Sequence, residues 1–101
     1  MTIHSERLDQ DSIVIFLSGR LDTASSSEFE LKINQLVDGN SDIIFDLKEL
    51  SYISSLGLHV LLVAKKKMTA NKRKFVVKNA GGLVKEVFEM TGFDTLVTLG
   101  N

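Results

Sequence analysis

The stretch that decides the fold reads Asp46-Leu47-Lys48-Glu49-Leu50-Ser51-Tyr52-Ile53-Ser54-Ser55-Leu56-Gly57-Leu58. Its beginning overlaps an apolar run at residues 43–47, which is typical of a buried strand. Residues 48–53 are predicted to be a connection, and a long helix is predicted over residues 55–70. Two adjacent serines therefore stand at the start of a helix, where unpaired N–H groups and the positive end of the helix dipole favour an anion.

Working outward from this stretch, hydrophobic periodicity predicts alternating strands and helices. Residues 3–8 and 12–18 form a hairpin, with the first strand at an edge, and residues 19–22 break the strand pattern. A helix opens at residues 23–28 and ends before Gly39-Asn40. A strand at residues 75–78, a helix after Gly81-Gly82 and a last strand at residues 93–99 complete the chain. The order is β-β-α-β-α-β-α-β, an α/β fold with a mixed, largely parallel sheet in a single domain spanning residues 1–101.

Composition excludes several classes of function. The chain has 101 residues, a formal net charge of -1, no cysteine and two histidines. No disulfide scaffold or thiol enzyme is compatible with this count, and His4 and His59 have no partner at metal-ligand spacing, so we expect no metal and no cofactor. The near-neutral charge argues against direct nucleic-acid binding. No leader-like start and no apolar run near the ~20 residues of a membrane span are present, so we expect a cytoplasmic protein without membrane contact.

Three other features have ordinary explanations. His59, alone inside the long helix, is interpreted as a surface or boundary residue. Gly81-Gly82 lacks the further glycines and lysine of a phosphate-binding loop and is interpreted as a flexible helix start. A basic group holds half of the positive charge within ten residues: Lys65, Lys66, Lys67, Lys72, Arg73 and Lys74. No aromatic residue interleaves with this group, so we interpret it as charge that favours a helix C-terminus and a solvated strand start.

The serine pair has two interpretations. Ser54 or Ser55 is an ordinary N-cap worth about 1 kcal/mol, which spacing alone favours. Alternatively, one serine accepts a phosphate, which adds about -1.5 to -2 charge and three acceptor oxygens. The helix start tolerates that charge, so modification would change the surface shown to a partner without unfolding the domain.

The sequence resembles the STAS-domain anti-sigma factor antagonists of bacterial partner-switching systems. Two stretches carry the resemblance, Leu17-Ser18-Gly19-Arg20-Leu21-Asp22 and the stretch from Asp46-Leu47 through Ser54-Ser55-Leu56-Gly57-Leu58. The resemblance implies a binding partner and kinase substrate, not an enzyme. Its unphosphorylated form binds a cognate anti-sigma factor serine kinase and releases the client of that kinase. Phosphorylation of a serine at the start of the second helix switches binding off, and a PP2C-type phosphatase restores it. The protein is expected to be a monomer when free.

Carried over residue by residue, the family pattern Asp-Ser-Ser/Thr/Ala-Gly falls on Ser54-Ser55-Leu56-Gly57, and a family aspartate falls on Asp22 beside the acceptor. Members with alanine at the second small position use the serine before it. The resemblance therefore implies Ser55 as the acceptor, with Ser54 as the fallback. It also places Asp22, Ser54, Leu56, Gly57 and Leu58 at the partner-binding surface. Ser54 in place of the usual aspartate and Leu56 in place of a small residue are departures from the pattern.

Those departures keep two alternatives open. One is a STAS scaffold module that works in a sensory complex without being phosphorylated. The other is a small-ligand or nucleotide-binding domain that uses Gly81-Gly82 and the basic group at residues 65–74.

Overall fold

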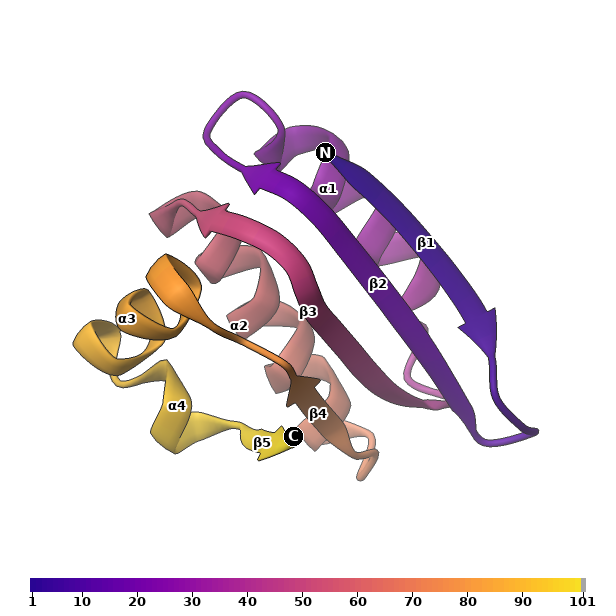
Figure 1. Cartoon of the computed structure of the whole chain (residues 1–101). Helices are drawn as coiled ribbons and strands as arrows, with labels where there is room; N and C mark the ends of the chain where they lie inside the picture. The colour runs from indigo at the N-terminus through magenta and orange to yellow at the C-terminus, as the bar shows by residue number, and fades with distance from the viewer. Residues whose placement is uncertain (101) are drawn as a thin grey trace.

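Five strands form one mixed sheet whose spatial order follows the chain, β1-β2-β3-β4-β5 (Figure 1). The computed structural model describes residues 1–100, with side chains described through residue 97. β1 (Thr2–Arg7) and β2 (Ser12–Leu21) form the predicted antiparallel hairpin. β3 (Asp42–Ile53), β4 (Phe75–Lys78) and β5 (Thr98–Gly100) each run parallel to the strand before them. The mixed α/β architecture predicted from the alternating pattern is therefore confirmed.

The helices cover one face of this sheet. α1 (Ser26–Leu36) and α2 (Ser55–Ala70) lie behind the strands in Figure 1, and α3 (Gly82–Thr91) and α4 (Phe93–Leu96) lie to one side near α2. Alternate strand residues such as Ile15, Phe45 and Val77 point into the core, where they join Phe29, Leu61 and Phe88 from the helices. Within the described residues, no helix combines the length and apolar character that crossing a membrane requires.

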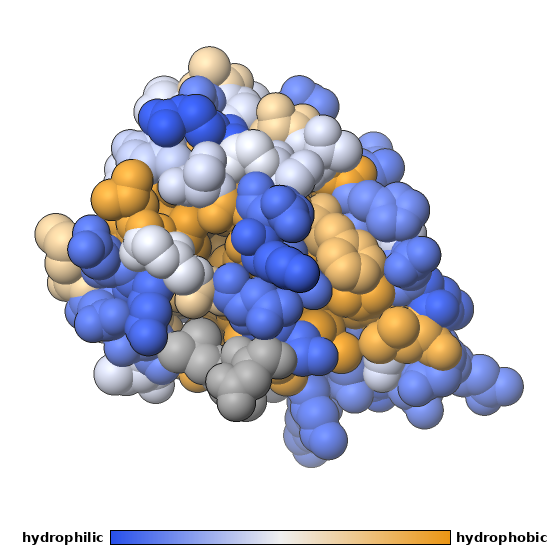
Figure 2. Space-filling view, viewed as in Figure 1, coloured by the Kyte–Doolittle hydropathy of each residue, from blue (hydrophilic) through white to orange (hydrophobic). Residues whose placement is uncertain are grey.

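The opposite face of the sheet is not covered by any described element. It carries the strand residues whose side chains point away from the helices, including Phe16, Ile44 and Val76, which are only partly buried. His4 stacks on Phe16 with ring centroids 6.0 Å apart. Figure 2 shows this face as apolar surface over the middle of the sheet, broken up by hydrophilic side chains. The site described below lies away from this face, at the end of the sheet where β2 and β3 finish.

The predicted break at residues 19–22 was wrong over residues 19–21, and the predicted connection at residues 48–53 was wrong. β2 continues to Leu21 and β3 continues to Ile53, and the two tails pair in parallel with two register shifts. Gly19 adopts a positive φ of 92° at one of these irregularities, which explains why the sequence there looks like a turn. The Ser51 hydroxyl donates to the Gly19 carbonyl at 3.0 Å, and Arg20 lies over the Tyr52 ring at 4.5 Å. The paired tails carry the chain to the start of α2 without a loop.

The predicted strand at residues 93–99 was wrong over its first half. Residues Phe93–Leu96 form the short helix α4, and only Thr98–Gly100 is a strand. Gly92, with φ 76°, ends α3 in the left-handed conformation and turns the chain directly into α4. Phe93 then packs on Phe88 with ring centroids 4.8 Å apart. On α2, Val63 is 48% exposed and lies outside the buried stripe of that helix.

Candidate functional site

Ser54 is a buried structural residue that links the starts of α1 and α2. It is the N-cap of α2, and its side chain accepts a hydrogen bond from the Gly57 N–H at 3.1 Å. Its backbone N–H donates to the Leu21 carbonyl at 2.7 Å. Its Oγ also lies 3.3 Å from the Oγ of Ser26, and both serines are 6% exposed. Because the Ser54 hydroxyl is buried and already paired, it is poorly placed to react with an external group.

Ser55 has the opposite environment. It is the first residue of α2 and is exposed to solvent. The next residue, Leu56, is 50% exposed and presents an unpartnered apolar side chain beside it. At this position the N–H groups of the first helical turn are the ones that lack partners within the helix. A negatively charged group on the Ser55 oxygen would therefore meet both a free approach from solvent and a favourable helix end.

Gly57 lets the start of α2 approach the sheet. A Cβ at this position would lie 2.6 Å from Leu21 Cγ and 2.8 Å from Leu21 Cδ2. Leu21 is fully buried, so its side chain has little room to move away. The neighbouring Leu58 is buried in the core. Gly57 and Leu58 thus fix the position of the helix start, and they do so from inside the molecule.

Asp22 organises the turn between β2 and α1. Its carboxylate accepts hydrogen bonds from the backbone N–H and the hydroxyl of Ser25 at 3.0 and 2.9 Å. These two bonds, aided by the charge of Arg20, lower the pKa of Asp22 below its ordinary value. The Asp22 carbonyl accepts from the Ser26 hydroxyl at 2.7 Å, and Ser26 in turn meets Ser54. Asp22 is therefore connected to the serine pair through Ser26.

Two shallow grooves flank the exposed side of the α2 start. One, of about 120 Å³, lies against α1 and is lined by Ser26, Ser27, Glu30, Leu56, His59 and Val60. The other, of about 230 Å³, lies against α3 and α4 and is lined by Ser55, Leu58, His59, Leu62, Thr91, Phe93 and Leu96. The exposed ridge between the grooves is made of Ser55, Leu56 and His59, and we call it the α2 ridge.

Sequence reasoning missed two parts of this arrangement. Ser26 was grouped with its neighbours as helix-start chemistry, yet it is a buried bridge between Asp22 and Ser54. A buried serine between a partly buried and an exposed serine gives no periodic signal that sequence alone can read. The two grooves and the place of His59 on the α2 ridge were also missed, because they depend on where α1, α3 and α4 lie.

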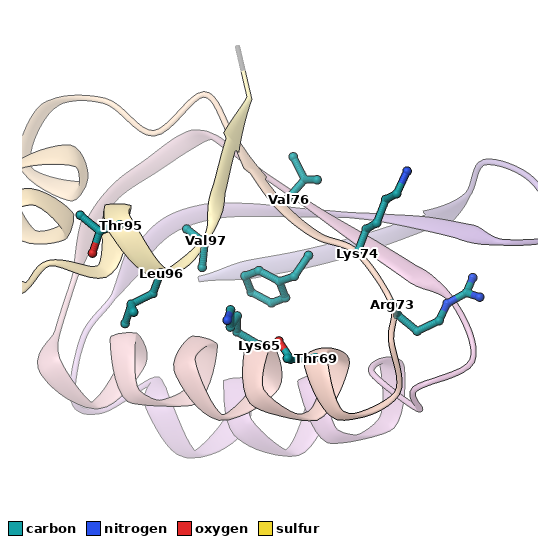
Figure 3. Close-up of a pocket in the computed structure, with 9 residues that line it drawn as sticks. Lys65, Thr69, Arg73, Lys74, Val76, Thr95, Leu96 and Val97 are labelled. Atoms are coloured by element: carbon teal, nitrogen blue, oxygen red, sulfur yellow. The ribbon is translucent and has the colours of Figure 1, made fainter.

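The basic group lies at the other end of α2, beside a cleft of about 730 Å³. Figure 3 shows Lys65 and Thr69 on α2 facing residues 95–97 across this cleft, whereas the side chains of Arg73 and Lys74 extend away from it. Arg73 is held by Asp42, with Nε and Oδ1 3.2 Å apart. Gly81-Gly82 follows the opposite end of β4 and does not line the cleft. The two halves of the predicted ligand site are therefore separated.

Metal ligation has no geometric basis in the part of the chain that the structure describes. No three His, Asp or Glu side chains come together there in a way that could hold an ion. The α2 ridge, the two grooves and the Asp22–Ser26–Ser54 chain remain as the candidate site, and their chemistry is that of a hydroxyl on a docking surface.

Comparisons with known proteins identify the family. The sequence pattern of the STAS domain matches residues 4–101. An anti-sigma-B factor antagonist of Listeria monocytogenes is 29% identical over 103 residues, covering 100% of this chain and 90% of that protein. The structure of the anti-sigma factor antagonist SpoIIAA in its unphosphorylated form matches with a TM-score of 0.82 at 22% identity, over 99% of this chain and 89% of that one. A structure of SpoIIAA of Bacillus in the phosphorylated form matches with a TM-score of 0.76 at 22% identity, over 99% and 92% of the two chains. Because the family pattern extends over nearly the whole sequence, the chain belongs to the STAS domain family.

Proposed function

We propose that this protein is an anti-sigma factor antagonist controlled by phosphorylation of Ser55. The unphosphorylated form binds an anti-sigma factor serine kinase through the α2 ridge and releases the client of that kinase. The observation that carries the proposal is the contrast between the two serines, since Ser55 is exposed at the first position of α2 whereas Ser54 is buried and paired. The Listeria protein and SpoIIAA are both named anti-sigma factor antagonists, which supports the antagonist part of the proposal.

Phosphorylation would change the ridge without dismantling the fold. A phosphate on Ser55 takes the net charge from -1 to between about -2.5 and -3. The helix start accommodates that charge, so the α2 backbone stays in place. The phosphate would stand beside the exposed Leu56 and the two grooves, where it replaces a small neutral hydroxyl with a bulky hydrated anion. The kinase would bind this surface more weakly, and a PP2C-type phosphatase would restore the binding form.

The decisive experiment maps the acceptor with matched serine variants. The protein, Ser54→Ala and Ser55→Ala are each incubated with ATP and a candidate anti-sigma factor serine kinase, and phosphate is located by mass spectrometry. We expect phosphate on Ser55 in the unchanged protein and in Ser54→Ala, and none in Ser55→Ala. Phosphate on Ser54 would reverse the assignment, and phosphate on neither serine would refute the switch.

The same variants test the binding half of the proposal. Ser55→Ala is expected to bind the kinase at least as well as the unchanged protein, because it keeps a small neutral side chain at the ridge. Ser55→Asp should bind more weakly, since it places a charge there. Calorimetric titration of the kinase with each variant measures the difference, and equal affinities would show that Ser55 does not control docking.

A scaffold role in a sensory complex remains the competing function, favoured by Leu56 where the family has a small residue. In that case the protein would migrate with a large assembly on size-exclusion chromatography, whether or not it carries phosphate. A switch protein would instead leave its complex when Ser55 is phosphorylated. The same chromatography on extracts with and without phosphatase treatment distinguishes the two functions.

A further inference from the structure

His59 lies one helical turn beyond Ser55 on the same side of α2. The two residues are four apart in a helix that runs unbroken from Ser55 to Ala70, and side chains at that spacing are neighbours on the helix surface. Both are exposed, and both line the groove between α2 and the α3–α4 segment. The imidazole is therefore within reach of a group attached to the Ser55 oxygen.

The charged neighbours of His59 are few. On the α1 side, Glu30 lines the small groove that His59 shares. On the α3–α4 side, the groove is lined by Thr91, Phe93 and Leu96, which bring no charge. On α2 itself, the next basic residue on this side is Lys66, about two turns further along. No lysine or arginine lines either groove, and within the described residues no acidic group lies within ion-pair distance of His59.

We propose that His59 is a positioning residue that pairs with the phosphate on Ser55 and makes the phosphorylated state sensitive to pH. This inference rests on the proposed function, since it requires a phosphate at that position. Imidazole and phosphate monoesters both change charge between about pH 5 and pH 8. The imidazolium form favours the phosphate dianion, so the pair holds the phosphate over the α3–α4 groove near pH 6.5. An uncharged imidazole, the form that alkaline conditions favour, leaves the phosphate held by the helix start alone.

Pairing has a consequence for the lifetime of the phosphorylated form. A phosphate engaged by His59 has to leave its partner before it enters the active site of a phosphatase. Dephosphorylation is therefore slower than in a variant without the imidazole near pH 6.5, and equally fast near pH 8. The rate ratio between the protein and His59→Gln at each pH cancels the pH dependence of the phosphatase itself.

The test does not depend on the kinase. Phosphoserine is installed at position 55 during translation, and the second ionisation of the phosphate is followed by ³¹P NMR between pH 4.5 and pH 8.5. The comparison uses the otherwise unchanged protein, His59→Gln and the control His4→Gln, since His4 lies on the opposite sheet face stacked on Phe16. Circular dichroism establishes that each variant keeps its fold, and His59→Asn serves as a second variant.

We expect the phosphate to ionise at a pH about 0.3 units lower with His59 present than in His59→Gln, as an exposed pair at this helical spacing provides. His4→Gln should match the protein with both histidines. Coincidence of the curves with and without His59 would overturn the pairing, whatever the kinase experiment shows. A shift in the ionisation of the phosphate in His4→Gln as large as that in His59→Gln would also overturn it. The shift would then come from the overall charge of the protein and not from a neighbouring imidazole. Conversely, pairing without phosphorylation by the kinase would refute the proposed switch and leave the pairing intact.

Discussion

At the scale of single residues, the two adjacent serines differ in burial and in hydrogen bonding. Ser54 closes the strand β3 and caps α2, and its hydroxyl is paired on the inside of the molecule. Ser55 is the first residue on the helix surface and faces solvent. The resemblance implied Ser55 as the acceptor with Ser54 as a fallback, and the geometry supports that order of preference. The resemblance places an aspartate where this chain has Ser54, and both residue types are good N-caps.

The electrostatic contribution of Asp22 predicts a pH dependence of stability. Its pKa is lowered in the folded protein, so its ionised form is stabilised by folding. That contribution is fully present above the ordinary aspartate range near about pH 4 and is lost as the pH falls through the lower folded value. Asp22→Asn should therefore be less stable than the unchanged protein at pH 7, and the difference should shrink towards pH 2.

Urea denaturation at pH 7, 4 and 2.5 measures this difference. Glu86→Gln is a matched control. Glu86 is exposed on α3, and this substitution also removes one negative charge. The free energy of unfolding of Glu86→Gln should differ from that of the unchanged protein by a nearly constant amount at the three pH values. A difference for Asp22→Asn that also stayed constant with pH would show that the carboxylate charge is not what the Ser25 hydrogen bonds stabilise.

At the scale of elements, the position of α2 is set by the close contact between Gly57 and Leu21. Gly57→Ala should destabilise the protein by about 1–3 kcal/mol, because the added methyl group overlaps a buried side chain that cannot easily move. Gly81→Ala is the control, since a Cβ there has no heavy atom within 4 Å and should change stability by less than about 0.5 kcal/mol. Urea denaturation gives both values.

A double variant identifies the contact itself. Leu21→Ala alone should cost about 2–5 kcal/mol, because it leaves a cavity. In Gly57→Ala/Leu21→Ala the new methyl group occupies part of that cavity, so the combined loss should fall short of the sum by about 1 kcal/mol or more. Simple additivity would mean that Gly57 is needed for a reason other than its approach to Leu21.

The helices and strands also show which parts of the fold sequence patterns can predict. α2 was predicted with its observed bounds, because a long apolar stripe follows a capping residue and ends in basic residues. The tails of β2 and β3 were not predicted, since Gly19-Arg20 and Lys48-Glu49 look like a turn and an exposed connection. Each tail is stable only because the other lies beside it, and such long-range pairing leaves no periodic signal in either segment. The candidate acceptor and its neighbour Leu56 were predictable from a local motif, whereas the role of Ser26 and the grooves beside His59 depend on packing.

At the scale of the whole molecule, one core supports both the sheet and the helices. Phe45 lies at its centre, fully buried and 5.4 Å from the Phe75 ring centroid. Phe45→Ala should cost about 3–5 kcal/mol, a large share of the 5–15 kcal/mol typical of natural domains. Met90→Ala, at a position that is 84% exposed, should change stability by less than about 0.5 kcal/mol.

Two spectroscopic probes report whether the sheet and the helices unfold together, as a shared core requires. Tyr52, the single tyrosine, gives a fluorescence signal from the end of the sheet, and circular dichroism at 222 nm reports the helices. Both transitions should coincide in urea, before and after Phe45→Ala, because loss of the core removes the support of both layers. Separate transitions would show that the helical layer and the sheet are stabilised independently.

The parallel pairing of β2 with β3 also bears on how fast the protein reaches its native state. The paired residues are about thirty positions apart, from Ser12 with Asp42 to Leu21 with Ile53, and α1 has to form and dock between them. Chains dominated by such distant pairings close large loops before they gain contact energy, and they fold more slowly than helical bundles of equal length. Refolding should therefore take milliseconds or longer. During that time Ser54 has neither Leu21 nor Ser26 to bind, so the difference between the two serines arises only when the tails of β2 and β3 meet.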